Sequence, residues 1–209
     1  MRHPREVEHG VREDVSRVTE DDGGERLILR DRSVVLVRPL EHSDQPLVEA
    51  VFDGMGEEAR YRRFLAFKKR LSASDLEHLT AVDHYDHEAL VALDAKTGAA
   101  VGVARMLREA GRPDAAEAAV EVVDVWQGRG LGGMLLERLV GRAREAGVRR
   151  FTSVLLTRNL SMLRLFERTG SVCVTGRYGE TLELEVELPF ETGAPQQALR
   201  LAAAGEVQG

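Results

Sequence analysis

The stretch VDVWQGRGLGGMLLERLVGRAREAG, residues 123–147, joins a valine-rich run to a glycine-rich loop and a long amphipathic segment. Gly128, Gly130 and Gly133 match the pattern G-x-G-x-x-G, and leucines recur after them at helical spacing. A helix N-terminus exposes unpaired backbone N–H groups, and glycines let an anion approach them closely. The stretch therefore predicts a strand, a phosphate-binding loop and a helix that ends at Gly147. The phosphate belongs either to a dinucleotide or to another phosphorylated cofactor.

The residues downstream of the loop argue against a dinucleotide. A dinucleotide-binding unit places an Asp or Glu about 20 residues on, at the end of the next strand, to hold the ribose hydroxyls. The next strand here, FTSVLL at residues 151–156, continues into Thr157, Arg158 and Asn159 with no acid. One short helix and two hairpin-like strands follow it, in place of further parallel strands. Another phosphorylated cofactor is therefore the favoured ligand.

Hydrophobic periodicity predicts an α/β domain around this loop. Strand candidates joined by short turns precede the loop and predict an antiparallel meander. We expect a mixed, mostly antiparallel sheet of six to seven strands with about four helices, and one strand–helix–strand crossover at the glycine loop. The expected strands cover residues 33–40, 88–94, 99–107, 115–125, 151–156, 171–176 and 181–189, and the expected helices residues 42–55, 71–82, 131–147 and 159–170.

The segment RYRRFLAFKKR, residues 60–70, carries six basic and three aromatic residues. One interpretation is a surface that steers an acidic substrate or a polyanion. The favoured interpretation is a further helix with a solvated basic face, whose apolar stripe consists of Tyr61, Phe64, Leu65 and Phe67.

The length of 209 residues suits one domain with additional ends. Residues 1–25 are dense in charge and residues 192–209 are rich in Ala, Gln and Gly, so neither end offers much apolar surface to bury. We expect a disordered charged tail over residues 1–25, a folded domain over residues 26–191 and a flexible C-terminal tail over residues 192–209.

Charge and hydropathy exclude two classes of partner. The formal net charge of −6 argues against binding to nucleic acid, and no apolar run approaches the roughly 20 residues that span a bilayer. The charged N-terminus lacks the apolar region of a secretory signal, and the single cysteine, Cys173, cannot form an internal disulfide. The expected location is the cytoplasm, with no membrane partner. Alternation around Cys173 predicts a buried small side chain.

Two motifs resemble those of the GNAT superfamily of acyl-CoA-dependent N-acetyltransferases. The run Gln127–Gly132 resembles the Q/R-x-x-G-x-G/A pyrophosphate loop, and NLSMLRLFERTG at residues 159–170 resembles the N-x-x-A-x-x-L-Y-x-x-x-G helix. With the order of strands and helices, the resemblance covers about residues 33–188. SVVLVRPL at residues 33–40 and AEAAVEVVDVWQGRGLG at residues 116–132 are similar to the acetyltransferase domain of bacterial protein-lysine acetyltransferases.

The resemblance implies a GNAT fold, acetyl-CoA as co-substrate without a metal, and an amine acceptor such as a protein lysine, in a monomer or homodimer. It also implies a cofactor site in which the strand end pairs with the pantetheine arm, the loop amides hold the pyrophosphate, and an asparagine lies near the arm. The implied cofactor-binding residues are Val122, Val123, Gln127, Gly128, Arg129, Gly130, Leu131, Gly132 and Asn159.

Transfer to a lysine requires a general base, because the side-chain amine with its pKa near 10.4 is almost wholly protonated at neutral pH. Glu117 and Glu121 are four residues apart and so lie on one face of an unbroken strand. The resemblance favours Glu117 as the catalytic residue. Many relatives also carry a tyrosine that protonates the leaving thiolate, where this chain has Phe166. That departure leaves a non-catalytic acyl-CoA-binding regulator open as an alternative. An acetyltransferase of small-molecule amines is a second alternative, because the resemblance implies that the acceptor groove is built from the variable region of residues 43–88.

The run DHYDHE, residues 83–88, has the composition of a metal site but not the spacing of a tetrahedral one. A polar turn before the following strand is the better interpretation. We expect no metal at this position.

Overall fold

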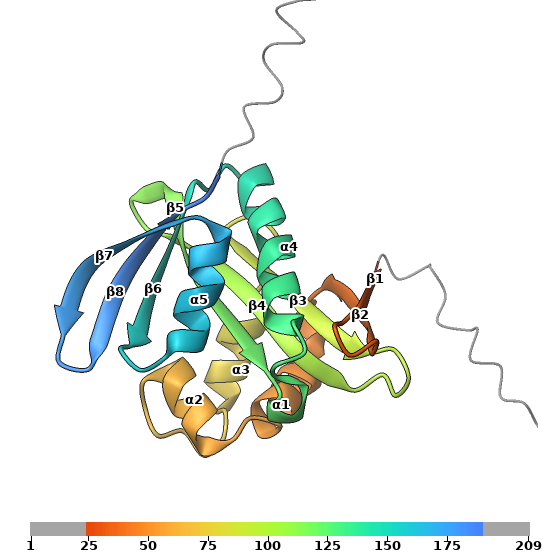
Figure 1. Cartoon of the computed structure of the whole chain (residues 1–209). Helices are drawn as coiled ribbons and strands as arrows, with labels where there is room; N and C mark the ends of the chain where they lie inside the picture. The colour runs from red at the N-terminus through yellow and green to blue at the C-terminus, as the bar shows by residue number, and fades with distance from the viewer. Residues whose placement is uncertain (1–23, 190–209) are drawn as a thin grey trace, which may run out of the picture.

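The computed structural model describes residues 24–189, which fold around an eight-stranded mixed sheet with the strand order β1-β2-β3-β4-β5-β6-β8-β7 (Figure 1). Neighbouring strands run antiparallel except β5 and β6, which are parallel and joined by α4. This is the predicted crossover at the glycine loop. The strands are β1 (Glu25–Ile28), β2 (Val34–Pro39), β3 (His87–Asp94), β4 (Ala100–Glu109), β5 (Arg112–Val122), β6 (Arg150–Leu156), β7 (Ser171–Tyr178) and β8 (Thr181–Glu187).

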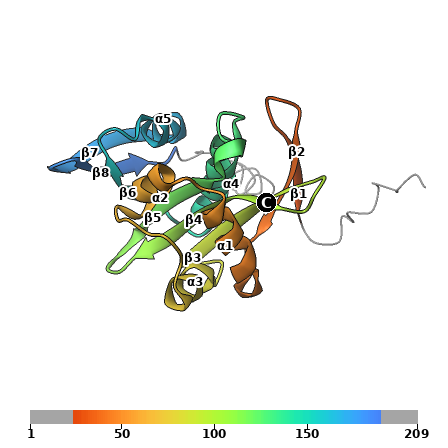
Figure 2. The same cartoon turned by 90° about the horizontal axis from the view of Figure 1, so that it is seen from below.

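Five α-helices cover the two faces of the sheet (Figure 2). One face is covered by α4 and α5, and the other by α1 and α3, with α2 in contact with β6. The helices are α1 (Gln45–Asp53), α2 (Glu57–Phe64), α3 (Ala73–Thr80), α4 (Leu131–Glu145) and α5 (Leu160–Thr169). Each layer has its own core. Leu135, Leu139 and Phe166 pack beneath α4 and α5, whereas Val48 and Phe52 pack beneath α1 and α3.

The sheet opens between its two parallel strands. β5 and β6 pair only at Ala115, Ala116 and Glu117, opposite residues 150–152. β5 continues to Val122 with β4 alone as its partner, while β6 continues with β8. Beyond Glu117, β5 and β6 therefore no longer form backbone hydrogen bonds with each other. The candidate site lies in the opening between their edges.

The predicted fold class is confirmed, with some differences in the elements. The eighth strand, β1, was not expected, because in its sequence ERLI only Leu27 is buried and the pattern is too short to be periodic. β5 ends at Val122 and not at residue 125, since Asp124–Trp126 form a 3₁₀ turn. The predicted tails lie outside the described residues, apart from Gly24 and Glu25.

Two local predictions were wrong. The helix expected over residues 60–70 ends at Phe64, because Leu65 adopts a left-handed φ of 52°, and Phe67 is 90% exposed instead of completing an apolar stripe. Cys173 is exposed on β7, since that strand lies at the edge of the sheet and presents most of its side chains to solvent. Among residues 24–189, no helix is long and apolar enough to span a membrane.

Candidate active site

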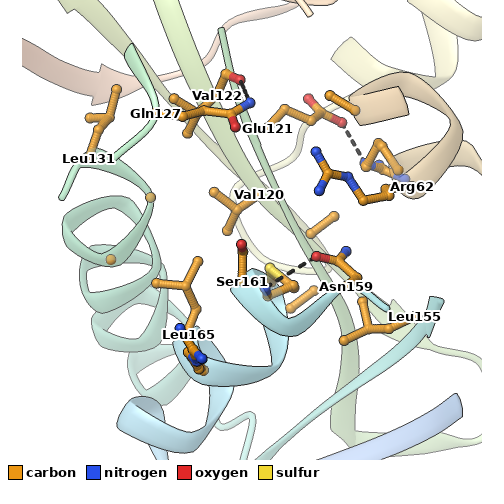
Figure 3. Close-up of a pocket in the computed structure, with 18 of the residues that line it drawn as sticks. Arg62, Val120, Glu121, Val122, Gln127, Leu131, Leu155, Asn159, Ser161 and Leu165 are labelled. Atoms are coloured by element: carbon orange, nitrogen blue, oxygen red, sulfur yellow. Dashed lines mark hydrogen bonds and ion pairs between the residues drawn. The ribbon is translucent and has the colours of Figure 1, made fainter. Parts of the chain in front are cut away.

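The opening between β5 and β6 forms a cavity of about 450 Å3 (Figure 3). The C-terminal half of β5, the glycine loop, β6, α5 and the first residues of α4 line it, and α2 borders it from the other face of the sheet. Of the predicted site residues, the cavity brings together Glu117, Val122, Gln127, Gly128, Gly130, Leu131, Gly132 and Asn159. Val123 and Arg129 do not line it.

Backbone alternation along β5 explains why Val122 lines the cavity and Val123 does not. The Val123 N–H donates to the carbonyl of Val101 on β4 at 3.0 Å, so the backbone groups of odd-numbered residues here face β4. Those of Val120 and Val122 face the opposite side, where β6 has moved away. The edge at Val120 and Val122 is thus available to an extended ligand that pairs like a strand.

The side chains of β5 alternate between the two faces of the sheet. Val120 and Val122 pack toward α4, with methyl groups 3.7 Å from the position of a Cβ added at Gly132. Glu117 and Glu121 therefore point to the opposite face, toward α2. The cavity joins an apolar wall on the α4 and α5 side to a pair of carboxylates on the α2 side.

Glu117 occupies the last paired position before the strands part, opposite Thr152. Its side chain is exposed to the cavity, between the buried residues Ala116 and Ala118. No hydrogen bond or ion pair within residues 24–189 engages its carboxylate. Glu117 is thus a strand residue with free lone pairs at the point where the cavity opens.

Glu121, the other candidate base, is buried in an ionic network. Its Oε1 accepts from Arg63 Nε on α2 at 2.6 Å, and its Oε2 from the buried Arg105 at 3.4 Å; Figure 3 shows Glu121 directed at α2. Burial alone would raise the Glu121 pKa, but the charges of Arg105 and Arg63 outweigh burial and hold it below its usual value. A carboxylate with both oxygens engaged and a lowered pKa is a poor base.

The glycine loop ends in an uncapped helix N-terminus. Gly128 and Gly130 have φ of 75° and 95°, in the left-handed region that glycine adopts readily. Gly130 is the N-cap of α4, so no side-chain oxygen satisfies the first N–H groups of the helix. These donors and the helix dipole suit a phosphate group that enters from the cavity.

Two loop side chains serve the loop itself. Gln127 Nε2 donates to the Val122 carbonyl at 3.0 Å (Figure 3). It also donates to Asp124 Oδ1 at 2.9 Å, and the two hydrogen bonds fix the turn after β5. Arg129 pairs with Asp31 at 3.0 Å and donates to the Val125 carbonyl. Arg129 therefore ties the loop to the β1–β2 turn.

Asn159 both caps a helix and lines the cavity. Its Oδ1 accepts from the Met162 N–H at 3.3 Å, which caps α5, and the residue also lines the cavity. Phe166, seven residues after Asn159 on α5, is fully buried in the core. No hydroxyl is present at that position.

The polar run over residues 83–88 is a turn, as interpreted from its spacing. Asp83 accepts from the backbone N–H groups of three following residues, and His84 pairs with the buried Glu88 at 3.0 Å. In the part of the chain that the structure describes, no three His, Cys, Asp or Glu side chains converge as metal ligands.

Five arginines surround the cavity: Arg30, Arg62, Arg63, Arg164 and Arg168. Arg62 and Arg63 belong to the basic segment 60–70 noted in the sequence, whereas sequence reasoning missed the other three. Arg164 and Arg168 are four residues apart and so share one face of α5, which was a detectable signal. Arg30 had no such signal, because only the unexpected β1–β2 turn brings it to Gly130, where an added Cβ would lie 3.3 Å from its Nε.

Comparison with known proteins identifies the family. The model of the acetyltransferase (GNAT) family matches residues 56–170. Acetyltransferase Pat of Mycolicibacterium smegmatis is 36% identical over 156 residues, 73% of this chain and 45% of that protein, so the chain spans about half the length of this relative. An acetyltransferase of Pseudomonas aeruginosa is 33% identical over 148 residues, covering 69% of this chain and 78% of that protein.

A solved structure agrees with this assignment. The GNAT domain of S. lividans PAT matches with a TM-score of 0.71 and 30% identity, covering 79% of this chain and 97% of that domain. The fold and the acyltransferase class predicted from the loop and helix motifs are thereby confirmed. The chain belongs to the acetyltransferase (GNAT) family.

Proposed function

We propose that this domain transfers an acetyl group from acetyl-CoA to the side-chain amine of a protein lysine, with Glu117 as general base. The main support is that one cavity contains both the glycine loop and an unpaired carboxylate, on opposite sides of the opened sheet. The loop suits the pyrophosphate, the edge at Val120 and Val122 suits the pantetheine arm, and Glu117 faces the side that an acceptor enters.

The residues of the chain have distinct parts in the proposed direct transfer. Bound acetyl-CoA supplies the thioester, whose carbonyl carbon forms a bond to the acceptor nitrogen while its bond to sulfur breaks. Glu117 accepts the proton that the ammonium group loses to become nucleophilic. The N–H groups on the free edge of β5 donate to the carbonyl oxygen as its charge develops. The nitrogen loses its second proton to water as the amide forms, and water protonates the departing thiolate, because Phe166 has no proton to give.

The acceptor side favours a long side chain on a large molecule. Glu117 is exposed at the opening, and the bordering residues Ala59 and Arg62 come from the short helix α2. A lysine stem of four carbons can reach Glu117 while its protein stays outside the cavity. A protein-lysine acceptor also agrees with the similarity of residues 116–132 to protein-lysine acetyltransferases.

The acceptor class is tested by thiol release from acetyl-CoA in the presence of proteins, polyamines or aminoglycosides. We expect release with lysine-bearing proteins, together with a mass increase of one acetyl group on lysine. Release with small amines alone would identify a small-molecule acetyltransferase. Binding of acetyl-CoA with no release for any acceptor would identify a non-catalytic regulator. Both outcomes contradict the proposal.

The proposed setting of the enzyme follows the same reasoning. We infer catalysis without a metal by a cytoplasmic monomer or homodimer. The single cysteine of the chain, Cys173, has no second thiol to pair with, which suits a reducing compartment.

Replacing Gly130 by alanine tests the loop. Its φ of 95° is unfavourable for any residue with a Cβ, by about 1–2 kcal/mol. Relief of this strain turns the N–H groups of the loop away from the phosphate, so we expect the Kd for CoA, measured by calorimetry, to rise about tenfold. Gly111→Ala is the matched control, because Gly111 has a φ of 79° in the distant β4–β5 turn. This control should lose stability and keep its affinity for CoA; equal affinities of the two variants would contradict the role of the loop.

A further inference from the structure

A second cavity, of about 700 Å3, adjoins the proposed cofactor site. It is a groove between the β1–β2 turn, α4 and α5, outside the opened sheet. Its walls are partly apolar, with Ile28, Met134 and Val140 among the lining residues. The two cavities share five residues: Arg30, Gly130, Gly133, Leu165 and Arg168. The groove therefore begins where the glycine loop meets α4.

Unpaired arginines lie on both walls at the junction of the two cavities. Arg30 comes from the β1–β2 turn on one side of Gly130. Arg164 and Arg168 come from α5 on the other side and flank Leu165, which contacts the start of α4 at Gly132. Within residues 24–189, none of these three guanidinium groups has a hydrogen-bond or ion-pair partner in the protein.

Other charged groups nearby are paired with one another. Arg129 is paired with Asp31 at 3.0 Å, and Arg138 with Glu25 at 2.8 Å. The acid that lines the groove, Glu137, shares the same Arg138 at 3.0 Å, so Arg138, Glu25 and Glu137 together carry one negative charge. Arg144 adds a positive charge to the groove that offsets it, and its buried Nε has no hydrogen-bond partner among the described residues. The junction thus carries an excess of positive charge that a strongly anionic ligand would balance.

We propose that Arg30 and Arg168 bind the 3′-phosphate of coenzyme A, and that the groove receives its adenosine, so that the protein selects coenzyme A over its 3′-dephospho form. This inference rests on the proposed use of acetyl-CoA. The pyrophosphate on the glycine loop lies at the entrance of the groove, so the adenosine end of the same ligand extends into it. Arginine suits a phosphate because its planar fork donates two parallel hydrogen bonds to the oxygens.

Only one member of this pair falls within the family motifs. Arg168 is at a variable position of the helix motif, whereas Arg30 lies outside the residues matched by the family model, which begin at residue 56. It reaches the groove through the β1–β2 hairpin, which places Arg30 N–H in a hydrogen bond to the Arg129 carbonyl at 3.1 Å. The selectivity is therefore a property of the β1–β2 hairpin together with α5.

Isothermal titration calorimetry with CoA and 3′-dephospho-CoA tests the inference. We expect the unaltered protein to bind CoA at least about tenfold more tightly. Arg30→Gln and Arg168→Gln should each raise the Kd for CoA about tenfold and change that for 3′-dephospho-CoA by less than about twofold. Adenosine 3′,5′-bisphosphate should compete with CoA better than adenosine 5′-diphosphate does, and this advantage should shrink in both variants.

Arg142→Gln is the matched control, since Arg142 is exposed on α4 and lines neither cavity. It removes the same charge and should leave both affinities unchanged. The inference is overturned if the unaltered protein binds both ligands equally, or if the two variants weaken both ligands alike. Failure of the unaltered protein to bind either ligand would instead contradict the proposed use of acetyl-CoA. Thermal unfolding of each variant separates lost contacts from lost folding.

Discussion

Replacing Glu117 by glutamine is expected to lower kcat/KM for acetyl transfer about 10²–10⁴-fold, the usual contribution of a general base. The amide keeps the size of the carboxylate but cannot accept a proton from the ammonium group. Because the carboxylate has no partner within residues 24–189, its loss leaves no buried group unsatisfied. Affinity for CoA and the free energy of unfolding should therefore stay unchanged, as measured by calorimetry and urea denaturation.

The pH dependence of Glu117→Gln separates a base from a merely structural group. A lysine amine becomes neutral without a base as the pH approaches its pKa near 10.4. The ratio of kcat/KM between the unaltered protein and Glu117→Gln should therefore fall as the pH rises from 7 toward 10. Glu187→Gln is the matched control, an exposed strand glutamate on β8 away from the cavity, and should keep full activity. An unchanged rate for Glu117→Gln at pH 7 would rule out the proposed role.

The sequence predicted the parts of the site that depend on local pattern. The loop, the helix after it and the helix that begins after Asn159 are short-range features, and the structure has all three. Glu117 was favoured by the resemblance to protein-lysine acetyltransferases, through its offset from Gln127, and a continuous strand and a turn separate the two residues.

Features that depend on distant partners were not predictable. Val123 seemed equivalent to Val122, yet its N–H is used by Val101, a partner set by the register of β4. Arg129 was predicted as a cofactor-binding residue, but its ion pair with Asp31 depends on the unexpected hairpin and had no signal in the sequence. The helix at residues 57–64 ends because Leu65 turns left-handed, which the helical pattern of residues 60–70 did not reveal.

Replacing Glu121 by alanine should destabilise the fold by about 3–5 kcal/mol, the usual effect of breaking a buried ion pair. Arg105 is fully buried, and without Glu121 its charge would keep only a hydrogen bond to the Leu79 carbonyl at 2.6 Å. Its Nε already lacks a hydrogen-bond partner among the described residues, so the Arg105 guanidinium depends on few contacts. Urea denaturation at pH 7 measures the effect, and a loss below about 1 kcal/mol would contradict the dependence of Arg105 on Glu121.

The pH dependence of this loss of stability follows from the direction in which the Glu121 pKa is shifted. Burial raises it, but Arg105 and Arg63 lower it further, so the net pKa in the folded protein lies below the ordinary value of 4.5. A lowered pKa stabilises the fold above 4.5, and this contribution disappears as the pH falls through the folded-state pKa. The difference in the free energy of unfolding between the unaltered protein and Glu121→Ala should stay constant from pH 7 to about 5. It should become smaller below pH 4.5.

A double replacement shows whether the instability of Glu121→Ala comes from the unpaired charge of Arg105 or from lost packing. Glu121→Leu with Arg105→Met removes both buried charges and keeps the apolar volume, and such replacements of whole ion pairs are often neutral or stabilising. Arg63 remains near the surface, where its guanidinium lies 4.9 Å from the ring centroid of Phe64. We expect the double variant to be at least about 2 kcal/mol more stable than Glu121→Ala. A double variant as unstable as Glu121→Ala would show that the packing of α2 against the sheet, and not the charge of Arg105, makes Glu121 necessary.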